Sequence, residues 1–125
     1  MDENQRRADE RCLLIVEDRE DILGLLTTIA TLQGWVVAGA KNGPDALKAF
    51  SAGRFKLALV DVTLTDGMGG IEVAQSFLRL DPALKIVMMS GSPGDEDRVR
   101  EAGLGHFLAK PFPPTRLIEL LERRI

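Results

Sequence analysis

The sequence is poor in the residues that build disulfides and soft-metal sites. One cysteine, Cys12, and one histidine, His106, occur in 125 residues. A single cysteine excludes an internal disulfide and favours a reducing compartment. Cys12 begins the apolar run "CLLIV", where we expect a buried, inert thiol. The same scarcity disfavours a zinc site, which usually draws on nitrogen and sulfur ligands.

The chain also lacks basic runs and long apolar segments. Its 16 Lys and Arg are scattered among 19 Asp and Glu, so bulk electrostatics favour neither direct nucleic-acid binding nor a membrane surface. Charges interrupt every apolar run before it could span a membrane. The first residues, "MDENQRRADE", lack the apolar stretch of a signal peptide. We therefore expect a cytoplasmic protein with a flexible arm over 1–10 and one domain over 11–125.

Five short apolar runs alternate with stretches of helical spacing. The short lengths and the β-branched or bulky residues of these runs favour strands at 12–16, 35–40, 57–60, 85–90 and 106–109. We expect helices between and after them, the second ending near Gly53 and the third running from Gly70 to Leu80. The residues expected to face inward are Ile22, Leu25, Leu26, Ile29 and Leu32, then Ala46, Leu47 and Phe50, then Val73, Ala74, Phe77 and Leu78, then Val99 and Ala102, and finally Leu117, Ile118, Leu121 and Ile125.

This alternation predicts the fold class. A crossover that contains a helix joins parallel strands, and such crossovers are right-handed. The expected fold is an α/β protein, a three-layer α/β/α sandwich with a five-stranded parallel sheet covered by helices on both faces.

Polar side chains follow four of the five expected strands. Glu17 and Asp18 follow the first strand, Asp61 the third and Lys110 the fifth, while Ser90 closes the fourth. In a parallel sheet these positions meet at one edge, which is where ligands bind. Two carboxylates about 4 Å apart repel by roughly 4 kcal/mol at an effective dielectric of 20. Three together therefore favour a hard cation such as Mg²⁺, with a phosphoryl group nearby. The edge could bind a phosphate ester, or Asp61 could itself become an aspartyl phosphate.

These segments, taken together, resemble the receiver domains of two-component response regulators. "LIVEDREDI" resembles the first strand with its acidic pair, and "LVDVTL" the segment around the phospho-accepting aspartate. "IVMMSGS" resembles the hydroxyl-bearing fourth strand, and "HFLAKPF" the lysine–proline turn. The resemblance implies a flavodoxin-like strand order, 2-1-3-4-5, and a signalling switch rather than an enzyme.

Carried over residue by residue, the resemblance assigns the chemistry. Asp61 accepts a phosphoryl group from a phosphohistidine on a sensor histidine kinase or a histidine phosphotransfer protein. Asp18, Asp61 and the carbonyl of Thr63 hold Mg²⁺, and Glu17 acts through water. Ser90 and Lys110 contact the phosphoryl group. Phe107 is the switch aromatic, and Pro111 follows a cis peptide bond.

The resemblance also implies how the signal leaves the domain. Phosphorylation shifts the face formed by the fourth helix, fifth strand and fifth helix, which meets a downstream protein, an effector domain or a second copy. The alternatives are a stand-alone phosphorelay intermediate and a degenerate receiver that acts by protein binding. The loop "LTDGMGG" departs from the family pattern, with Thr65 in place of proline and one extra residue.

Two rival classes fit the sequence less well. A phosphatase of the haloacid-dehalogenase type needs a second aspartate two residues after the first, where this chain has Thr63. A flavodoxin-like cofactor binder needs a phosphate loop after the first strand, where "EDRED" would repel phosphate.

Overall fold

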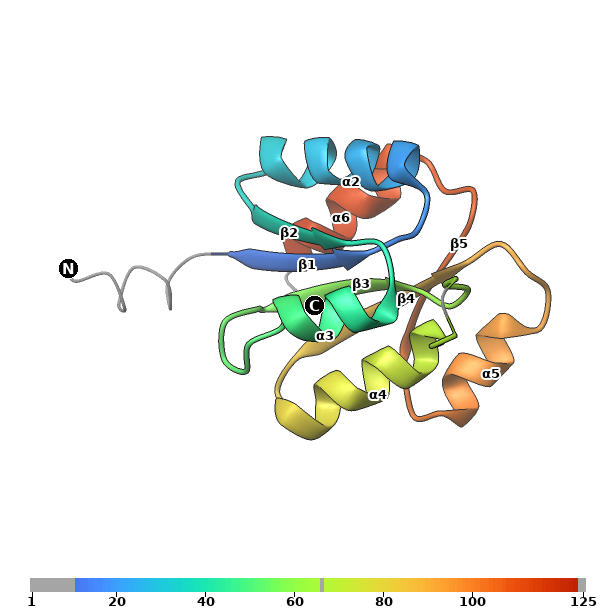
Figure 1. Ribbon diagram of the computed structural model, residues 1–125. Helices are drawn as coiled ribbons and strands as arrows, with labels where there is room; N and C mark the ends of the chain where they lie inside the picture. Colours follow the sequence, from blue (N-terminus) through green and yellow to red (C-terminus); the bar gives the residue numbers. More distant parts are fainter. Residues whose placement is uncertain (1–10, 66, 124–125) are drawn as a thin grey trace.

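Strand and helix alternate five times in the computed structural model, which describes residues 11–65 and 67–123 (Figure 1). The strands are β1 (Cys12–Val16), β2 (Val36–Ala40), β3 (Leu57–Asp61), β4 (Lys85–Ser90) and β5 (His106–Ala109). The helices are α2 (Glu20–Leu32), α3 (Gly43–Ala49), α4 (Gly70–Leu80), α5 (Asp95–Glu101) and α6 (Pro114–Arg123). The arm expected over 1–10 and the expected burial of Ile125 lie outside the described residues.

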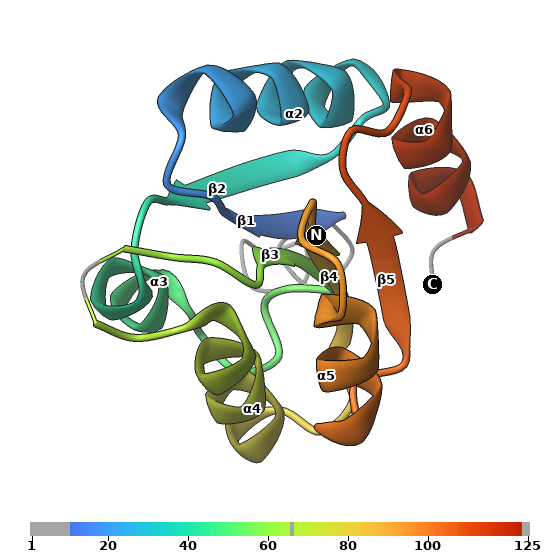
Figure 2. The ribbon, with the colours of Figure 1, turned by 90° about the vertical axis from the view of Figure 1, so that its right-hand side faces the viewer.

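The five strands form one parallel sheet in the order β2-β1-β3-β4-β5, which confirms the expected topology. Helices α2 and α6 cover one face of this sheet, and α3, α4 and α5 cover the other (Figure 1). The three-layer sandwich is therefore confirmed as well. Because all strands run the same way, their carboxyl ends meet at one edge, which faces the viewer in Figure 2.

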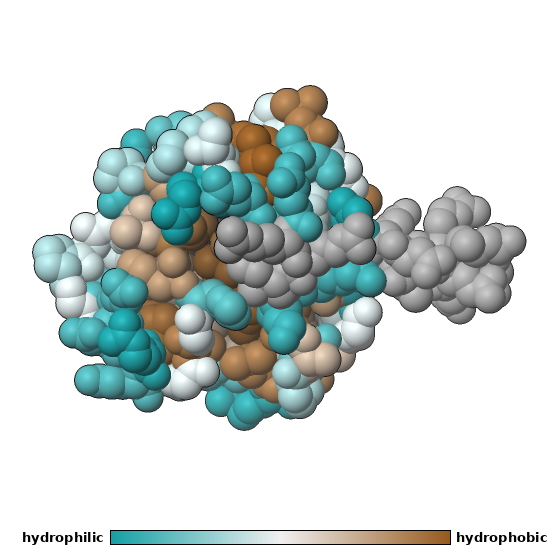
Figure 3. Space-filling view, turned by 180° about the vertical axis from the view of Figure 1, so that it is seen from behind, coloured by the Kyte–Doolittle hydropathy of each residue, from teal (hydrophilic) through white to brown (hydrophobic). Residues whose placement is uncertain are grey.

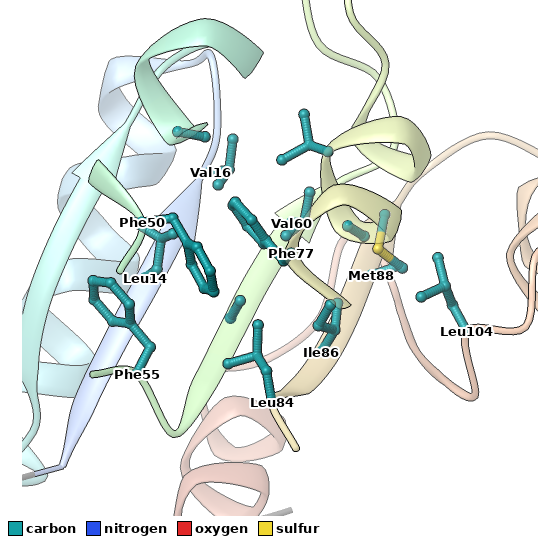
Figure 4. Packing of buried hydrophobic residues seen from close by; sticks show 14 of the residues in the cluster. Leu14, Val16, Phe50, Phe55, Val60, Phe77, Leu84, Ile86, Met88 and Leu104 are labelled. Atoms are coloured by element: carbon teal, nitrogen blue, oxygen red, sulfur yellow. The ribbon is translucent and has the colours of Figure 1, made fainter. Parts of the chain in front are cut away.

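Each face of the sheet carries its own apolar core. Along β1, Leu13 and Ile15 pack toward α2 and α6, whereas Leu14 and Val16 pack toward the other three helices. This alternation explains why the strand sequence is apolar throughout: both of its faces are buried. On the side of α3 and α4, the ring of Phe77 stacks on Phe50 with 4.5 Å between centroids (Figure 4).

The buried face of α2 differs from the expectation. Leu26 and Ala30 are buried, but Leu25 and Leu32 are 56% and 79% exposed. The apolar residues of this helix cover more than one side of it, and the sheet takes the side centred on Leu26. Leu25 and Leu32 lie about a quarter to a third of a turn away from that centre, so the prediction that they face inward was wrong.

Two smaller differences concern the ends of elements. Helix α3 ends at Ala49 rather than near Gly53, because Phe50 adopts an extended backbone and turns its ring onto Phe77. In α6, Leu117, Leu120 and Leu121 are buried. Ile118, which was expected to be buried, is only partly so.

Candidate functional site

The strands that precede or carry the predicted polar residues all end at one edge of the sheet (Figure 2). Backbone hydrogen bonds extend the strand pairing past the strand ends: Glu17 N donates to Ala40 O, Val62 N to Met89 O, and Lys110 N to Ser90 O. The backbones that carry the site are therefore as firmly placed as the sheet itself.

Lys110 connects two carboxylates at this edge. Its Nζ donates to Glu17 Oε1 and, at 2.6 Å, to Asp61 Oδ2. Glu17 is fully buried and Asp61 is 6% exposed. Backbone amides satisfy the remaining oxygens, because Arg19 N donates to Glu17 Oε2 and Thr63 N to Asp61 Oδ1. The ammonium thus offsets the repulsion between two buried negative charges.

Burial governs the protonation of Glu17. It raises the pKa of this carboxyl from 4.5 to about 7, against the hydrogen bonds from Lys110 and Arg19 N, which lower it. Burial would lower the pKa of Lys110, but its hydrogen bonds to Asp61 and Glu17 outweigh burial and raise it. Lys110 therefore stays charged, whereas the Glu17 carboxylate is destabilised around neutral pH.

The acidic residues are close enough together to hold a cation. Glu17, Asp18 and Asp61 each offer a carboxylate oxygen, and these oxygens lie within 4.8 Å of one another. All are hard oxygen donors, and Lys110 Nζ pairs with two of the three residues, Glu17 and Asp61. This donor set fits Mg²⁺, which binds through one or two carboxylates and keeps several waters. It does not fit Zn²⁺.

Gly70 allows a helix to approach the end of β3 closely. A Cβ built on Gly70 would lie 1.8 Å from the carbonyl oxygen of Asp61. The amide of Gly70 also donates to Val62 O at 3.0 Å, which joins the start of α4 to the residue after Asp61. Sequence reasoning placed a helix start here but missed this contact.

Ser90 lies at the carboxyl edge of the sheet, as expected. Its hydrogen-bond partners were not predicted. The residue is 3% exposed, and its hydroxyl donates to Asp95 Oδ2 at 2.5 Å while accepting from Ser92 N at 3.0 Å. Asp95 begins α5, is 6% exposed and also accepts from Arg98 Nη1. An acidic residue at the start of a charged helix usually faces solvent, so no signal in the sequence marked it.

Phe107 lies between the site and the α5 side of the sheet. It is partly buried against the core, and it lines a cavity of about 270 Å³ together with Ser90 and Lys110. A second cavity, of about 240 Å³, lies between Phe107 and Arg116 of α6. The peptide bond before Pro111 is cis, as the resemblance implied.

The chain matches the response regulator receiver domain over residues 13–122. It is 33% identical to the chemotaxis protein CheY of Thermotoga maritima over 115 residues, which cover 89% of this chain and 94% of that protein. It is 32% identical to the nitrogen assimilation regulatory protein NtrX of Azorhizobium caulinodans over 90% of this chain. Only 26% of NtrX is covered, so the chain spans a small part of that longer relative.

Solved structures agree with the sequence comparison. A CheY-like receiver domain protein of Methanospirillum hungatei superposes with a TM-score of 0.83 at 28% identity, covering 93% of this chain and 94% of that one. A beryllofluoride-activated DrrB receiver domain superposes with a TM-score of 0.81 at 25% identity, covering 92% and 97%. Within 11–65 and 67–123, no helix is long and apolar enough to cross a membrane. The chain belongs to the response regulator receiver domain family, whose members are phospho-accepting signalling switches of two-component systems rather than enzymes in the usual sense.

Proposed function

We propose that Asp61 of this chain accepts a phosphoryl group from a phosphohistidine, on either a sensor histidine kinase or a histidine phosphotransfer protein. The observation that carries the proposal is the cluster of Glu17, Asp18 and Asp61 at the carboxyl edge of the sheet, with Lys110 paired to Glu17 and Asp61. A carboxylate held beside two acids and one lysine is suited to receive a phosphoryl group with a cation present.

The transfer is a displacement at phosphorus. A carboxylate oxygen of Asp61 forms the new O–P bond as the P–N bond to the donor imidazole breaks, and the imidazole nitrogen keeps the bonding electron pair. Lys110 already contacts Asp61 Oδ2, so its ammonium is in place to pair with a phosphoryl oxygen. Thr63 N holds the other Asp61 oxygen.

Mg²⁺ is the proposed cofactor, held by Asp18, Asp61 and the carbonyl of Thr63, with Glu17 acting through water. When bound, it would neutralise charge on the phosphoryl oxygens during transfer. The proposal includes a cytoplasmic location, which the single, buried Cys12 favours because the fold needs no oxidising compartment.

We propose that the switch runs from Ser90 through Phe107 to the surface of α5, β5 and α6. Ser90 meets the phosphoryl group, and Phe107 turns into the cavity that both residues line. The side of the molecule that carries β5 and α6 exposes apolar groups among polar ones (Figure 3). Such a surface suits a protein partner, whether a downstream protein, an effector domain or a second copy.

The test measures phosphorylation directly. The wild-type chain is incubated with acetyl phosphate, with and without Mg²⁺, and the bound phosphoryl group is detected by intact mass. Asp61→Asn should abolish labelling, whereas Asp97→Asn, which alters an exposed acid on α5, should leave it unchanged. Trp35 precedes β2 at the opposite edge of the sheet, so its fluorescence is a poor substitute for mass.

Either result is informative. Mg²⁺-dependent labelling lost in Asp61→Asn supports the proposed acceptor. An unlabelled wild type at saturating Mg²⁺ would overturn it and favour a degenerate receiver that signals by binding alone.

A further inference from the structure

Asp95 is a buried carboxylate outside the acidic cluster of the site. It is the first residue of α5, is 6% exposed, and uses both of its oxygens. Oδ2 accepts from the Ser90 hydroxyl at 2.5 Å, and Oδ1 accepts from Arg98 Nη1 at 2.9 Å. Because Asp95 accepts the hydrogen bond that Ser90 donates, it can control the orientation of the Ser90 hydroxyl.

The hydroxyl of Ser90 cannot serve two acceptors. It has a single proton, which it donates to Asp95. Its oxygen also accepts a hydrogen bond from Ser92 N at 3.0 Å. Phosphoryl oxygens at neutral pH are hydrogen-bond acceptors. Ser90 must therefore release Asp95 before it can donate to a phosphoryl group.

We propose that Asp95 is a positioning residue that holds the Ser90 hydroxyl in a resting orientation and competes with the phosphoryl group for its one proton. The inference rests on the proposed function and adds its regulation. Because phosphorylation must break the Ser90–Asp95 hydrogen bond, it also removes a contact between β4 and the start of α5.

The position of Asp95 explains how this competition reaches the surface. Helix α5 is seven residues long and buries two of them, Asp95 and Val99. Losing the Ser90 contact therefore loosens one of its two buried anchors. Arg98 is 64% exposed and stays paired with Asp95, so the carboxylate can move outward with its countercharge. The cavity lined by Ser90 and Phe107 borders the same segment.

The first test measures Mg²⁺-dependent beryllofluoride binding by titration calorimetry. Asp95→Ala frees the Ser90 proton, so we expect affinity to rise about fivefold, the equivalent of one hydrogen bond of ordinary net strength. Asp95→Asn keeps the shape and a neutral acceptor, so it should lie between wild type and Asp95→Ala. The matched control is Asp97→Ala, which removes an exposed acid from the same helix and should leave affinity unchanged.

A double-mutant cycle separates this role from a general effect on α5. In a Ser90→Ala background the hydroxyl is absent, so Asp95→Ala should no longer raise affinity. An increase of the same size in both backgrounds would overturn the proposal. So would an unchanged or weakened affinity in Asp95→Ala itself.

A second readout needs no phosphoryl analogue. The Ser92 amide donates to Ser90 Oγ, so its hydrogen exchange, followed by NMR, reports the resting orientation of that hydroxyl. We expect faster exchange in Asp95→Ala and no change in Asp97→Ala. Unchanged Ser92 exchange in Asp95→Ala would overturn the positioning role. A wild type that binds no beryllofluoride would instead overturn the proposed function, and the Ser92 measurement would still decide the role of Asp95.

Discussion

Glu17 is a fully buried acid, and burial raises its pKa from 4.5 to about 7. Lys110 must serve both Glu17 and Asp61, and one ammonium cannot compensate two buried carboxylates completely. The residue therefore lowers the stability of the metal-free fold. A bound cation would remove that cost, which is the usual reason for retaining an unfavourable charge at a site.

Replacing this acid should make the metal-free protein more stable. The folded-state pKa of about 7 lies above the ordinary 4.5, so the unfolded chain releases the Glu17 proton first as pH rises. The free energy of unfolding therefore falls as pH rises from about 4.5 to about 7. Glu17→Gln cannot ionise, so we expect it to be more stable than wild type by about 3 kcal/mol at pH 8 and equally stable at pH 4. Urea denaturation without Mg²⁺ measures the stability of both proteins at each pH. The control is Glu119→Gln, which replaces an exposed acid.

The same variant should bind Mg²⁺ more weakly, as measured by calorimetry, because it removes one of the three site carboxylates. Equal stability of wild type and Glu17→Gln at pH 8 would contradict the assignment of Glu17 as a destabilised carboxylate.

Single residues of the site were largely predictable, for a topological reason. Glu17, Asp61, Ser90 and Lys110 follow or close strands that must end at one edge, so finding the strands placed them together. Asp95 was not predictable, because its burial depends on where α5 packs. A charged helix carries no pattern that fixes which of its acids turns inward.

At the scale of elements, the end of β3 is fixed by the helix that follows its loop. The start of α4 lies against the Asp61 carbonyl so closely that only a residue without a side chain fits at position 70. The backbone of the proposed acceptor is therefore held from the helix side as well as by its neighbouring strands.

A methyl group at this position should move the helix. We expect Gly70→Ala to destabilise the fold by about 1 to 3 kcal/mol, the usual cost of overpacking. It should also reduce labelling by acetyl phosphate, because the Asp61 backbone is displaced.

Gly24→Ala in α2 is the matched control, since no described atom lies within 4 Å of its added Cβ. Removing a glycine from a helix interior should stabilise by about 0.5 to 1 kcal/mol. Thermal unfolding distinguishes the Gly70→Ala and Gly24→Ala variants. A Gly70→Ala variant as stable as wild type would contradict the close approach of Gly70 to the Asp61 carbonyl.

The hydrophobic periodicity of the sequence predicted the strands and helices. It did not always predict which face of a helix is buried. Helix α4 buries Val73, Ala74 and Phe77, as its spacing predicts. In α2 the apolar residues allow two overlapping faces, and the choice between them depends on how the helix sits over the sheet. Leu25 and Leu32 were misplaced for that reason.

At the scale of the whole molecule, the sheet separates two apolar clusters and also joins them. Phe77 belongs to the cluster under α3 and α4, and Trp35 belongs to the cluster under α2 and α6. Residues next to each other in one strand contribute to opposite clusters, so neither cluster can form without the shared sheet. The alternating order of strands and helices was enough to predict the three-layer architecture. The strand order was implied only by the family resemblance.

A domain of this size should therefore unfold as one unit. Phe77 is fully buried and stacks on Phe50, so we expect Phe77→Ala to cost about 3 to 5 kcal/mol. Leu80→Ala, at a 60% exposed position in the same helix, should cost less than about 0.5 kcal/mol. Urea unfolding is followed by circular dichroism and by Trp35 fluorescence, which reports the opposite cluster. Both signals should shift to the same lower midpoint in Phe77→Ala, since the strands transmit the loss across the sheet. If Trp35 kept its wild-type midpoint while the helical signal moved, the two faces would unfold independently and the single-unit description would be wrong.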